Sequence, residues 1–509
     1  MGNIYRDMTL ENLDESYIGK ELKVAGWVEN IRDHGGVSFI DLRDMYGVLQ
    51  VVIRDTELLK GIKKEESISV EGLMEQRDEE TYNPKIKSGT IELEAHKITT
   101  LGQVYTQLPF EIQTSKEVRE DVRLKYRYLD LRNEKVKDNI LFRSKVIAYL
   151  RQKMTEMGFV EIQTPILCAS SPEGARDYIV PSRRYKGKFY ALPQAPQQYK
   201  QLLMVSGIDK YFQIAPCFRD EDARADRSPG EFYQLDMEMA FASQEDVFSV
   251  IEEVLPPVFA KYGVYSNASK APFVRIPYLE SMDKYGTDKP DLRIDLVLTD
   301  ATELLSGCGF GPFEGQTVKA IVVDGFTATR KQIDAICADV EVATANKAYW
   351  FKVDENGEIT GGIAKFLQNI KEQVINTLGL KPGDFVGLTA GKKLVAQKTA
   401  GVLRRLLGAA SEKHMKQNTY EFCWIVDFPM YEIGEESGEL EFCHNPFSMP
   451  QGGMDALKNK EPLDILAYQY DLVCNGVELS SGAVRNHKLK NSARIHTGEM
   501  EEVECDAFC

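Results

Sequence analysis

The first hundred residues alternate between apolar and polar positions in short runs, which turn signals separate. Five runs share this period of two: residues 21–28, 37–42, 48–53, 67–72 and 89–95. Gly35-Gly36 and Asn83-Pro84 lie between runs and mark turns. Alternation places successive side chains on opposite faces of a strand. Five short strands in so small a space predict a small closed β-barrel.

The period changes after residues 109–135, a segment rich in charge and tyrosine that we interpret as a hinge. Apolar residues then recur at helical spacing and predict a helix that ends near Gly158, a residue suited to a helix carboxyl-terminal cap. These apolar residues are Ile140, Ile147, Leu150, Met154 and Met157. The next residues, 159–164, alternate as a strand and stop at Pro165, which cannot donate to a central ladder.

Two further strands are predicted at residues 211–218 and 231–241, with a densely charged loop between them. Alternation along the second strand places four residues on one face: Phe232, Gln234, Asp236 and Glu238. The opposite face carries Tyr233, Leu235, Met237 and Met239. The pattern alone leaves two structures equally open, an exposed hairpin with a solvated face or a central antiparallel sheet with a polar pocket.

A different sequence pattern extends over residues 273–413. There, helix and strand patterns alternate and are separated by glycine- and aspartate-rich loops. It contains no obvious catalytic cluster, and we interpret it as an inserted domain. Strand-like patterns return within residues 420–487, at FCWIVDFPMYE and YDLVCNGVELSSGAVR. A length of 509 residues with 43% hydrophobic and 28% charged positions is typical of a globular protein of several domains.

Composition excludes some classes of protein and leaves others open. No apolar run is long enough to span a bilayer, and residues 1–20 lack a signal-peptide pattern, so we expect a cytoplasmic protein without membrane contact. The 9 cysteines form no CxxC pair, which disfavours a cysteine metal site. A formal charge of −16 argues weakly against a nucleic-acid partner, yet residues 181–200 carry five cations and no acid. On its own this stretch would be interpreted as a solvated loop.

Several motifs resemble those of the class II aminoacyl-tRNA synthetases. Arg219 within FRDED, before the strand EFYQLDMEM, is similar to their motif 2, and the helix and strand before Pro165 are similar to motif 1. Three further stretches, SPEGARDY, PQQYKQLLM and CHNPFS, are similar to the aspartyl-tRNA synthetases, and the inserted domain resembles their bacterial form. The class I signatures are absent. The motifs agree in order as far as about residue 487.

The resemblance implies a multidomain fold with a definite order. A five-stranded OB-type barrel that binds the anticodon would occupy residues 1–108, followed by the hinge. An α+β class II core with an antiparallel sheet would comprise residues 136–272 and 420–487. An inserted α/β domain of the bacterial GAD-like kind would lie between these two parts, at residues 273–419. Motif 1 builds the dimer interface in this class, so the resemblance implies a homodimer.

The implied activity is that of an aspartate–tRNA ligase. L-aspartate attacks the α-phosphate of ATP to give an adenylate, and the terminal ribose of tRNA(Asp) then accepts the aspartyl group without a covalent enzyme intermediate. Arg219 would be catalytic, because a guanidinium fork suits both a carboxylate and the α-phosphate. The residues implied for aspartate are Glu173, Gln197, Lys200, Arg219, Asp236, His444 and Arg485. Those implied for ATP are Arg219, Asp220, Glu221 and Glu478.

Charge complementarity underlies two parts of this assignment. Lys200 and Arg485 would hold the side-chain carboxylate of aspartate, so a neutral asparagine would leave a cation unpaired. Asp471 and Glu478 would hold Mg²⁺, for which carboxylate oxygens are suitable ligands. Without the resemblance, these two acids would be interpreted as ordinary residues at strand ends.

Four barrel residues match anticodon-reading positions of the family: Arg32, His34, Phe39 and Gln50. An aromatic ring and an amide on a strand face suit stacking and edge recognition of unpaired bases. A phenylalanine in a strand is more often a core residue, so Phe39 keeps that alternative. His34 stands in a turn where relatives that charge both tRNA(Asp) and tRNA(Asn) tend to have histidine, although a solvent-facing turn histidine would look the same. We expect tRNA(Asn) as a further partner.

Two departures from the family pattern affect these expectations. Ser228 replaces a common glutamine in a motif 2 loop that is one residue longer, so we expect one nucleotide contact to differ. Residues 488–509 do not resemble the family, and motif 3, with its arginine for the ATP phosphates, is not found. We therefore expect a poorly folded catalytic end with little or no adenylation activity in the chain as written.

Two other functions compete with this interpretation. A non-catalytic tRNA-binding or regulatory protein would keep the barrel and lose the ATP chemistry, and intact charged residues such as Arg219 and Glu478 argue against it. An asparaginyl or lysyl ligase is disfavoured by Lys200 with Arg485 and by the inserted domain.

Overall fold

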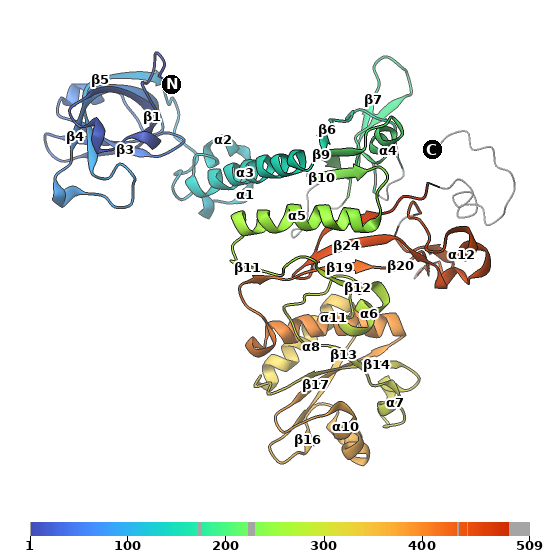
Figure 1. The fold of residues 1–509 in the computed structure, drawn as a ribbon. Helices are drawn as coiled ribbons and strands as arrows, with labels where there is room; N and C mark the ends of the chain where they lie inside the picture. The colour runs from blue at the N-terminus through green and yellow to red at the C-terminus, as the bar shows by residue number, and fades with distance from the viewer. Residues whose placement is uncertain (1, 172–174, 222–229, 435–436, 445, 488–509) are drawn as a thin grey trace. The chain divides into compact units, whose positions relative to one another are not determined.

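The structure, a computed structural model, describes residues 2–171, 175–221, 230–434, 437–444 and 446–487. The chain divides into two compact units, Met1–Leu141 and Phe142–Cys509. In Figure 1 the colour runs with residue number, so the first unit is drawn in the blue end of the scale. Within the described ranges, no helix combines the length and the apolar character needed to cross a membrane.

The first unit contains a closed five-stranded barrel with the strand order β1-β2-β3-β5-β4 (Figure 1). Its strands are β1 (Glu21–Asp33), β2 (Ser38–Arg43), β3 (Val48–Ile53), β4 (Ser67–Gln76) and β5 (Ile91–Gly102). Inward-facing residues such as Val24, Ile40 and Leu93 are fully buried and form its apolar core. The prediction of a small closed barrel is confirmed, and three strands are longer than alternation alone indicated.

The segment after the barrel is structured and packs within the same unit. It forms α1 (Glu120–Lys125), α2 (Arg127–Asp130) and the start of α3 (Glu134–Glu156). Asp130 is fully buried and accepts hydrogen bonds from Ser115 Oγ at 2.8 Å and Arg123 Nε at 3.1 Å. Arg132 Nη1 lies 2.7 Å from Glu65 Oε2, so an ion pair joins this segment to the barrel.

The second unit begins with most of α3, and two sheets form its core outside the inserted region. A three-stranded sheet has the order β10-β9-β6, and a four-stranded sheet has the order β12-β19-β24-β25. The bounds are β6 (Val160–Glu161), β9 (Lys210–Phe218), β10 (Glu231–Met239), β12 (Val274–Pro277), β19 (Phe422–Val426), β24 (Gln469–Cys474) and β25 (Val477–Ala483). Helix α5 (Gln244–Tyr262) lies between the two sheets (Figure 1). Its Val254 packs with Phe212 of one sheet and its Phe248 stacks on Trp424 of the other, which unites the core.

Two sequence predictions need comment here. The helix is confirmed, and Gly158 follows it with a φ of +83°, a left-handed conformation that glycine adopts without strain. The predicted strand at residues 159–164 is too long, because only Val160–Glu161 pairs with β9, in parallel. Beyond it the Thr164 amide donates to the Gln213 side chain at 2.8 Å, so a side chain replaces the backbone partner before Pro165.

The inserted region folds around a five-stranded sheet with the order β13-β14-β17-β15-β16, in which every strand pair is antiparallel. Its strands are β13 (Leu298–Asp300), β14 (Thr317–Val323), β15 (Ala348–Val353), β16 (Ile359–Thr360) and β17 (Phe385–Gly391). Helices α8 (Arg330–Thr344) and α11 (Lys393–Ala409) contribute to one apolar core against this sheet. Helices α7 (Thr302–Leu305), α9 (Ala364–Leu367) and α10 (Lys371–Leu378) contribute to a second core.

Shorter elements complete the second unit. Those nearest the site are β7 (Ile179–Pro181), β8 (Phe189–Ala191), α4 (Gln197–Val205) and α6 (Tyr278–Tyr285). The others are β11 (Asn267–Ala268), β18 (Thr419–Tyr420), β20 (Phe428–Pro429), β21 (Tyr431–Ile433), β22 (Leu440–Phe442), α12 (Gly453–Asn459) and β23 (Leu466–Ala467).

Candidate active site and anticodon-binding face

Buried charges from α4 and β10 form one end of the candidate site. Lys200 and Asp236 are only 6% and 8% exposed, and Lys200 Nζ lies 2.7 Å from Asp236 Oδ1. The same ammonium lies 3.3 Å from Glu238 Oε2, because residues two apart on a strand share a face. The polar face of β10 therefore packs against a buried cation and is not a solvated face, so the exposed-hairpin alternative is wrong.

A second cation reaches the same carboxylate. Arg485, two residues past β25, donates from Nη2 to Gln197 Oε1 and places Nε 3.9 Å from Glu238 Oε1. Glu238 thus contacts both Lys200 and Arg485. The two cations therefore lie close enough for a single carboxylate to bridge them. After the substrate that the sequence resemblance implies, we call Gln197, Lys200, Asp236, Glu238 and Arg485 the aspartate end of the site.

Two polar atoms beside these pairs are buried and have no hydrogen-bond partner among the described residues: Asp236 Oδ2 and Arg219 Nε. The Arg219 guanidinium lies 5.1 Å from the centre of the Phe232 ring, a cation–π contact that orients it. Burial and the neighbouring Asp236 carboxylate raise the pKa of Tyr211, which keeps its hydroxyl protonated. Asp236 Oδ2 and Arg219 Nε are suited to a ligand, because a buried polar atom without a partner is costly.

A second group of charges, which we call the nucleotide end, surrounds the β24–β25 hairpin. Asp471 on β24 is buried, and its Oδ1 has no hydrogen-bond partner among the described residues. Burial and the nearby Glu478 raise the pKa of Asp471 to about 7. Lys289 Nζ lies 3.0 Å from Glu478 Oε2 and 3.6 Å from Asp288 Oδ2. The two predicted metal-binding acids therefore influence each other, although the described residues contain no ready-made cluster of three metal ligands.

The remaining predicted residues are only partly placed. His444 packs edge-on against Phe428 with ring centres 4.8 Å apart, and the desolvation lowers its pKa. The Asp220 amide donates to Arg176 O at 2.9 Å, which ties the start of the motif 2 loop to the segment before β7. Glu221 is exposed beside it. Glu173, Ser228 and residues 488–509 lie outside the described residues.

The four predicted anticodon residues meet on one outer face of the barrel. Arg32 Nη2 donates to Gln50 Oε1 at 3.1 Å, and the Arg32 guanidinium lies 5.9 Å from the centre of the Phe39 ring. His34 contacts Phe39 edge-on, with ring centres 5.6 Å apart. Phe39 is half-buried and lies outside the barrel's core cluster, so the alternative core role is wrong. A partly exposed ring beside an arginine is a geometry suited to stacking of a base.

Comparisons with known proteins identify the family of both parts of the chain. The family described as tRNA synthetases class II (D, K and N) matches residues 119–506, past the point where the individual motifs cease to be recognisable. The OB-fold nucleic acid binding domain matches residues 22–101. The aspartate–tRNA ligase of Streptomyces coelicolor is 50% identical over 491 residues, which cover 95% of this chain and 83% of that protein. This chain belongs to the class II aspartate–tRNA ligase family.

Other relatives in this family bear on scope and fold. The aspartate–tRNA(Asp/Asn) ligase of Rickettsia bellii is 50% identical over 500 residues, covering 95% of this chain and 83% of that protein. A solved structure, the aspartyl tRNA synthetase from Entamoeba histolytica, has a TM-score of 0.53 at 18% identity and covers 96% of this chain and 80% of that chain. At this identity the likeness shows a shared fold and nothing more. The comparisons give no support to the non-catalytic alternative.

Sequence reasoning missed three charged residues of this class II site. Glu238 joins Lys200 to Arg485, and alternation along β10 already placed it on the polar face with Asp236. Lys289 reaches Glu478 from the loop after α6, and Asp288 beside it pairs with the same ammonium. The sequence carries no comparable signal for them, because a loop residue shows no periodicity and its neighbours are set by tertiary packing.

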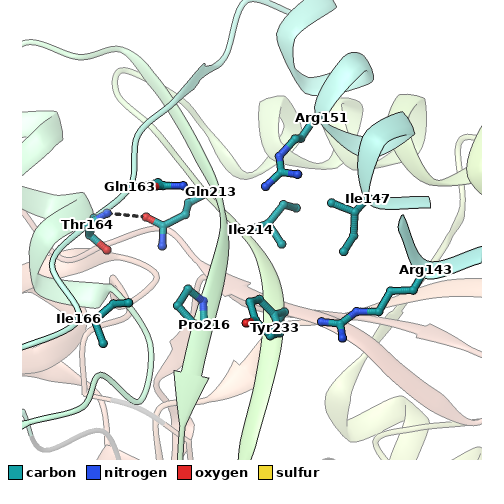
Figure 2. Close-up of a pocket in the computed structure, with 10 residues that line it drawn as sticks. All are labelled: Arg143, Ile147, Arg151, Gln163, Thr164, Ile166, Gln213, Ile214, Pro216 and Tyr233. Atoms are coloured by element: carbon teal, nitrogen blue, oxygen red, sulfur yellow. Dashed lines mark hydrogen bonds between the residues drawn. The ribbon is translucent and has the colours of Figure 1, made fainter. Parts of the chain in front are cut away.

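A cavity of about 470 Å³ lies away from both charged groups of the synthetase core (Figure 2). Tyr233 lines it from the face of β10 opposite Asp236, and Arg143 of α3 lies over the Tyr233 ring at 4.7 Å. The residues that line it are Arg143, Ile147, Arg151, Gln163, Thr164, Ile166, Gln213, Ile214, Pro216 and Tyr233. The helix and strand of motif 1 thus border an open hollow on the outer face of the core.

Proposed function

We propose that this chain is an aspartate–tRNA ligase that activates L-aspartate with ATP and transfers it to tRNA(Asp) in the cytoplasm. One observation carries the choice of aspartate. Lys200 and Arg485 converge on a single carboxylate, that of Glu238, at 3.3 Å and 3.9 Å. A substrate with a side-chain carboxylate would occupy the same pair of cations. A neutral amide could make only weaker, uncharged hydrogen bonds with these cations, which disfavours asparagine.

The residues around the cations have separate roles in this proposal. Asp236 Oδ2 would accept a hydrogen bond from the substrate ammonium, since it is buried and otherwise has no partner among the described residues. Gln197, through its contact with Arg485, would fix the orientation of that guanidinium. His444 would close the site from the CHNPFS segment, and Glu173 would contribute to the binding of the amino group.

Arg219 would bring the two reactants together. Its guanidinium is oriented by Phe232 and would bridge the α-carboxylate of aspartate and the α-phosphate of ATP. A carboxylate oxygen attacks the α-phosphorus, the bond to the bridging oxygen breaks, and pyrophosphate leaves with its electron pair. The ribose hydroxyl of tRNA then attacks the carbonyl carbon, and AMP leaves. Asp220 and Glu221 would contact the nucleotide, and no side chain forms a covalent bond.

Asp471 and Glu478 would hold Mg²⁺ at the nucleotide end. The fit rests on Asp471 Oδ1, which is buried without a hydrogen-bond partner among the described residues, and on Glu478 close to it. One or two carboxylates with substrate phosphates are a usual way for proteins to bind this ion. When bound, Mg²⁺ would neutralise charge on the phosphates of ATP.

The barrel would read the anticodon through Arg32, Phe39 and Gln50. We also propose tRNA(Asn) as a second substrate. The contact of His34 with Phe39 supports this, because it places the turn histidine against the proposed stacking ring. The relative from Rickettsia bellii, named an aspartate–tRNA(Asp/Asn) ligase, supports it too. Charging of purified tRNA(Asn) with aspartate tests the idea, and absence of charging under conditions that charge tRNA(Asp) refutes it.

We propose a homodimer formed through motif 1. Large apolar side chains are exposed along α3, the segment after β6 and the outer face of β10, among them Phe142, Ile166, Leu167 and Tyr233. Such a surface beside a hollow suits a self-complementary interface. Sedimentation should give twice the mass of the chain, and Tyr233→Glu should shift it to monomer. A wild-type monomer at micromolar concentration would contradict this proposal.

The decisive test of the function is aspartate-dependent exchange of labelled pyrophosphate into ATP by the 509-residue chain. The family match reaches residue 506, so, against the sequence expectation of little or no adenylation, we expect exchange with aspartate and none with asparagine at equal concentration. Exchange with asparagine alone would contradict the proposed substrate. Absence of exchange with either amino acid, in a chain that still binds tRNA, would contradict the activation step and favour a tRNA-binding role.

A further inference from the structure

The loop between α6 and the inserted sheet supplies charge to the nucleotide end. Its residues 287–291, TDKPD, place Lys289 between Asp288 and Glu478. The carboxylate of Asp471 also lies close enough to act on the Lys289 ammonium. Two carboxylates therefore contact one ammonium, and a third lies near enough to influence its pKa. The group carries excess negative charge when its acids are ionised, which suits a divalent cation and leaves Lys289 as its removable counter-charge.

The inserted region fixes the backbone of this loop from one side. Gly286 ends α6 with a φ of +69°, and a Cβ there would lie 2.3 Å from Gln397 O and 2.6 Å from Gly401 N of α11. The two helices therefore meet backbone against backbone at this point. Ser281 Oγ donates to Thr287 O at 2.7 Å, and the Lys289 amide donates to Thr287 Oγ1 at 3.1 Å.

The β24–β25 hairpin and α11 hold the end of the loop. A Cβ on Gly476, in the hairpin turn, would lie 3.4 Å from Asp291 Cβ and 3.7 Å from Lys289 O. Arg404 of α11 is buried and donates from Nη2 to Asp291 O at 3.1 Å. The Lys289 backbone is thus held between two elements, while its side chain is 33% exposed and contacts Glu478, which is 37% exposed. Only the side chain is free to change partner.

We propose that Lys289 is a nucleotide-binding residue: it pairs with Glu478 in the free enzyme and transfers to the polyphosphate of ATP when a divalent cation takes its place on Glu478. The inference rests on the proposed function and adds a residue to it. An ammonium on a flexible stem suits this exchange, because it donates in any direction and binds phosphate as a point charge. The exchange would couple cation binding to nucleotide binding without movement of the backbone.

Two measurements on Lys289→Met test the proposal. In pyrophosphate exchange, kcat/KM for ATP should fall on the order of tenfold, because a charge-assisted contact with phosphate is lost, while KM for aspartate should change less than about twofold. In a titration of the nucleotide-free chain with Mn²⁺, followed by electron paramagnetic resonance, affinity should rise about two- to fivefold. The rise is small because the lost competitor is a half-exposed ion pair.

Two further variants sharpen the test. Lys284→Met removes a lysine of α6 whose 2.7 Å ion pair with Glu280 lies on the surface, and it should behave as wild type in both assays. Lys289→Arg keeps the charge and should restore most of kcat/KM for ATP. A Lys289→Met chain that unfolds where Lys284→Met does not would overturn the proposal, because Lys289 would then be structural.

The outcomes separate this inference from the proposed function. If the wild-type chain lacks aspartate-dependent exchange, the proposed function fails, and the Mn²⁺ titration alone decides on Lys289. Equal or lower Mn²⁺ affinity in Lys289→Met overturns the competition with the cation. An unchanged kcat/KM for ATP in an active enzyme overturns the transfer to phosphate.

Discussion

The two ends of the candidate site differ in how their charges are balanced. At the aspartate end, Lys200 and Arg485 face two carboxylates, and Lys200 is buried with Asp236. At the nucleotide end, three carboxylates face Lys289, and the contact with Glu478 is half-exposed. The first arrangement balances its own charges, whereas the second carries excess negative charge. Both ends are joined by β25, which has Glu478 near its start and Arg485 just past its end.

This difference follows from what each end is proposed to bind. An amino acid has fixed charges, and buried cations that are already oriented discriminate between carboxylate and amide without reorganisation. A nucleotide binds together with a divalent cation. The nucleotide end therefore needs carboxylates that lie close together and whose mutual repulsion the cation relieves when it binds. Mutation at the aspartate end should therefore lower both stability and activity. Loss of an acid at the nucleotide end should raise stability and lower activity.

The largest effect is expected at the aspartate end, from Lys200→Met. The substitution leaves Asp236 and Glu238 buried without this partner, a change that costs about 3–5 kcal/mol in comparable buried pairs. Unfolding free energy and aspartate-dependent exchange should both fall, the latter on the order of a thousandfold. Lys186→Met on the exposed β7–β8 hairpin is the matched control and should leave both unchanged. Near-normal exchange by Lys200→Met would rule out the charge arrangement described here.

Asp471→Asn should separate stability from activity at the nucleotide end. The amide keeps the shape of the side chain but removes a charge that is buried beside Glu478. Without metal, unfolding free energy should rise by about 1–2 kcal/mol, because a buried like-charge contact is relieved. Mn²⁺ binding should weaken and exchange should fall on the order of a hundredfold. Leu472→Val is a control for packing on the same strand. A fall in both stability and activity of Asp471→Asn would erase the contrast between the two ends.

Arg32→Ala should leave both ends of the site intact and affect tRNA alone. Loss of the Arg32 contacts with Gln50 and Phe39 should lower kcat/KM for tRNA(Asp) on the order of tenfold, while pyrophosphate exchange without tRNA stays at the wild-type rate. Arg54→Ala, which removes an exposed barrel arginine paired with Glu94 at 3.2 Å, is the matched control. Equal losses in the two variants would show that charge on the barrel matters and the predicted positions do not.

The sequence predicted the elements whose residues have a period. Alternation found the barrel and the polar face of β10, and helical spacing found α3 with Gly158 at its end. The resemblance then selected Lys200, Asp236 and Arg485, and the structure brings these together. Periodicity works here because burial of one face constrains every second or every third to fourth residue.

What the sequence could not predict depends on packing between distant segments. Lys289 reaches Glu478 because a close approach of Gly286 to α11 fixes the loop, and nothing in TDKPD itself indicates that contact. The strand at residues 159–164 is shorter than its alternation suggests because the Gln213 side chain takes the Thr164 amide. Glu238 was on the predicted polar face, but its contact with Arg485, a residue far later in the chain, could be seen only in the structure.

Ionic strength should also distinguish the two ends, with the smallest effect of the four tests. Salt screens half-exposed charges far more than buried ones, with a Debye length of about 10 Å at 0.1 M and about 3 Å at 1 M. Raising KCl from about 0.05 to about 0.5 M should increase KM for ATP roughly threefold and KM for aspartate less than twofold. In Lys289→Met the increase for ATP should shrink, because the screened ammonium is gone. KCl and KNO₃ should act alike, since the argument concerns charge density and not the anion. Equal salt dependence of both KM values would mean that the aspartate end is as open to solvent as the nucleotide end, and the buried Lys200–Asp236 pair would not set the affinity for aspartate.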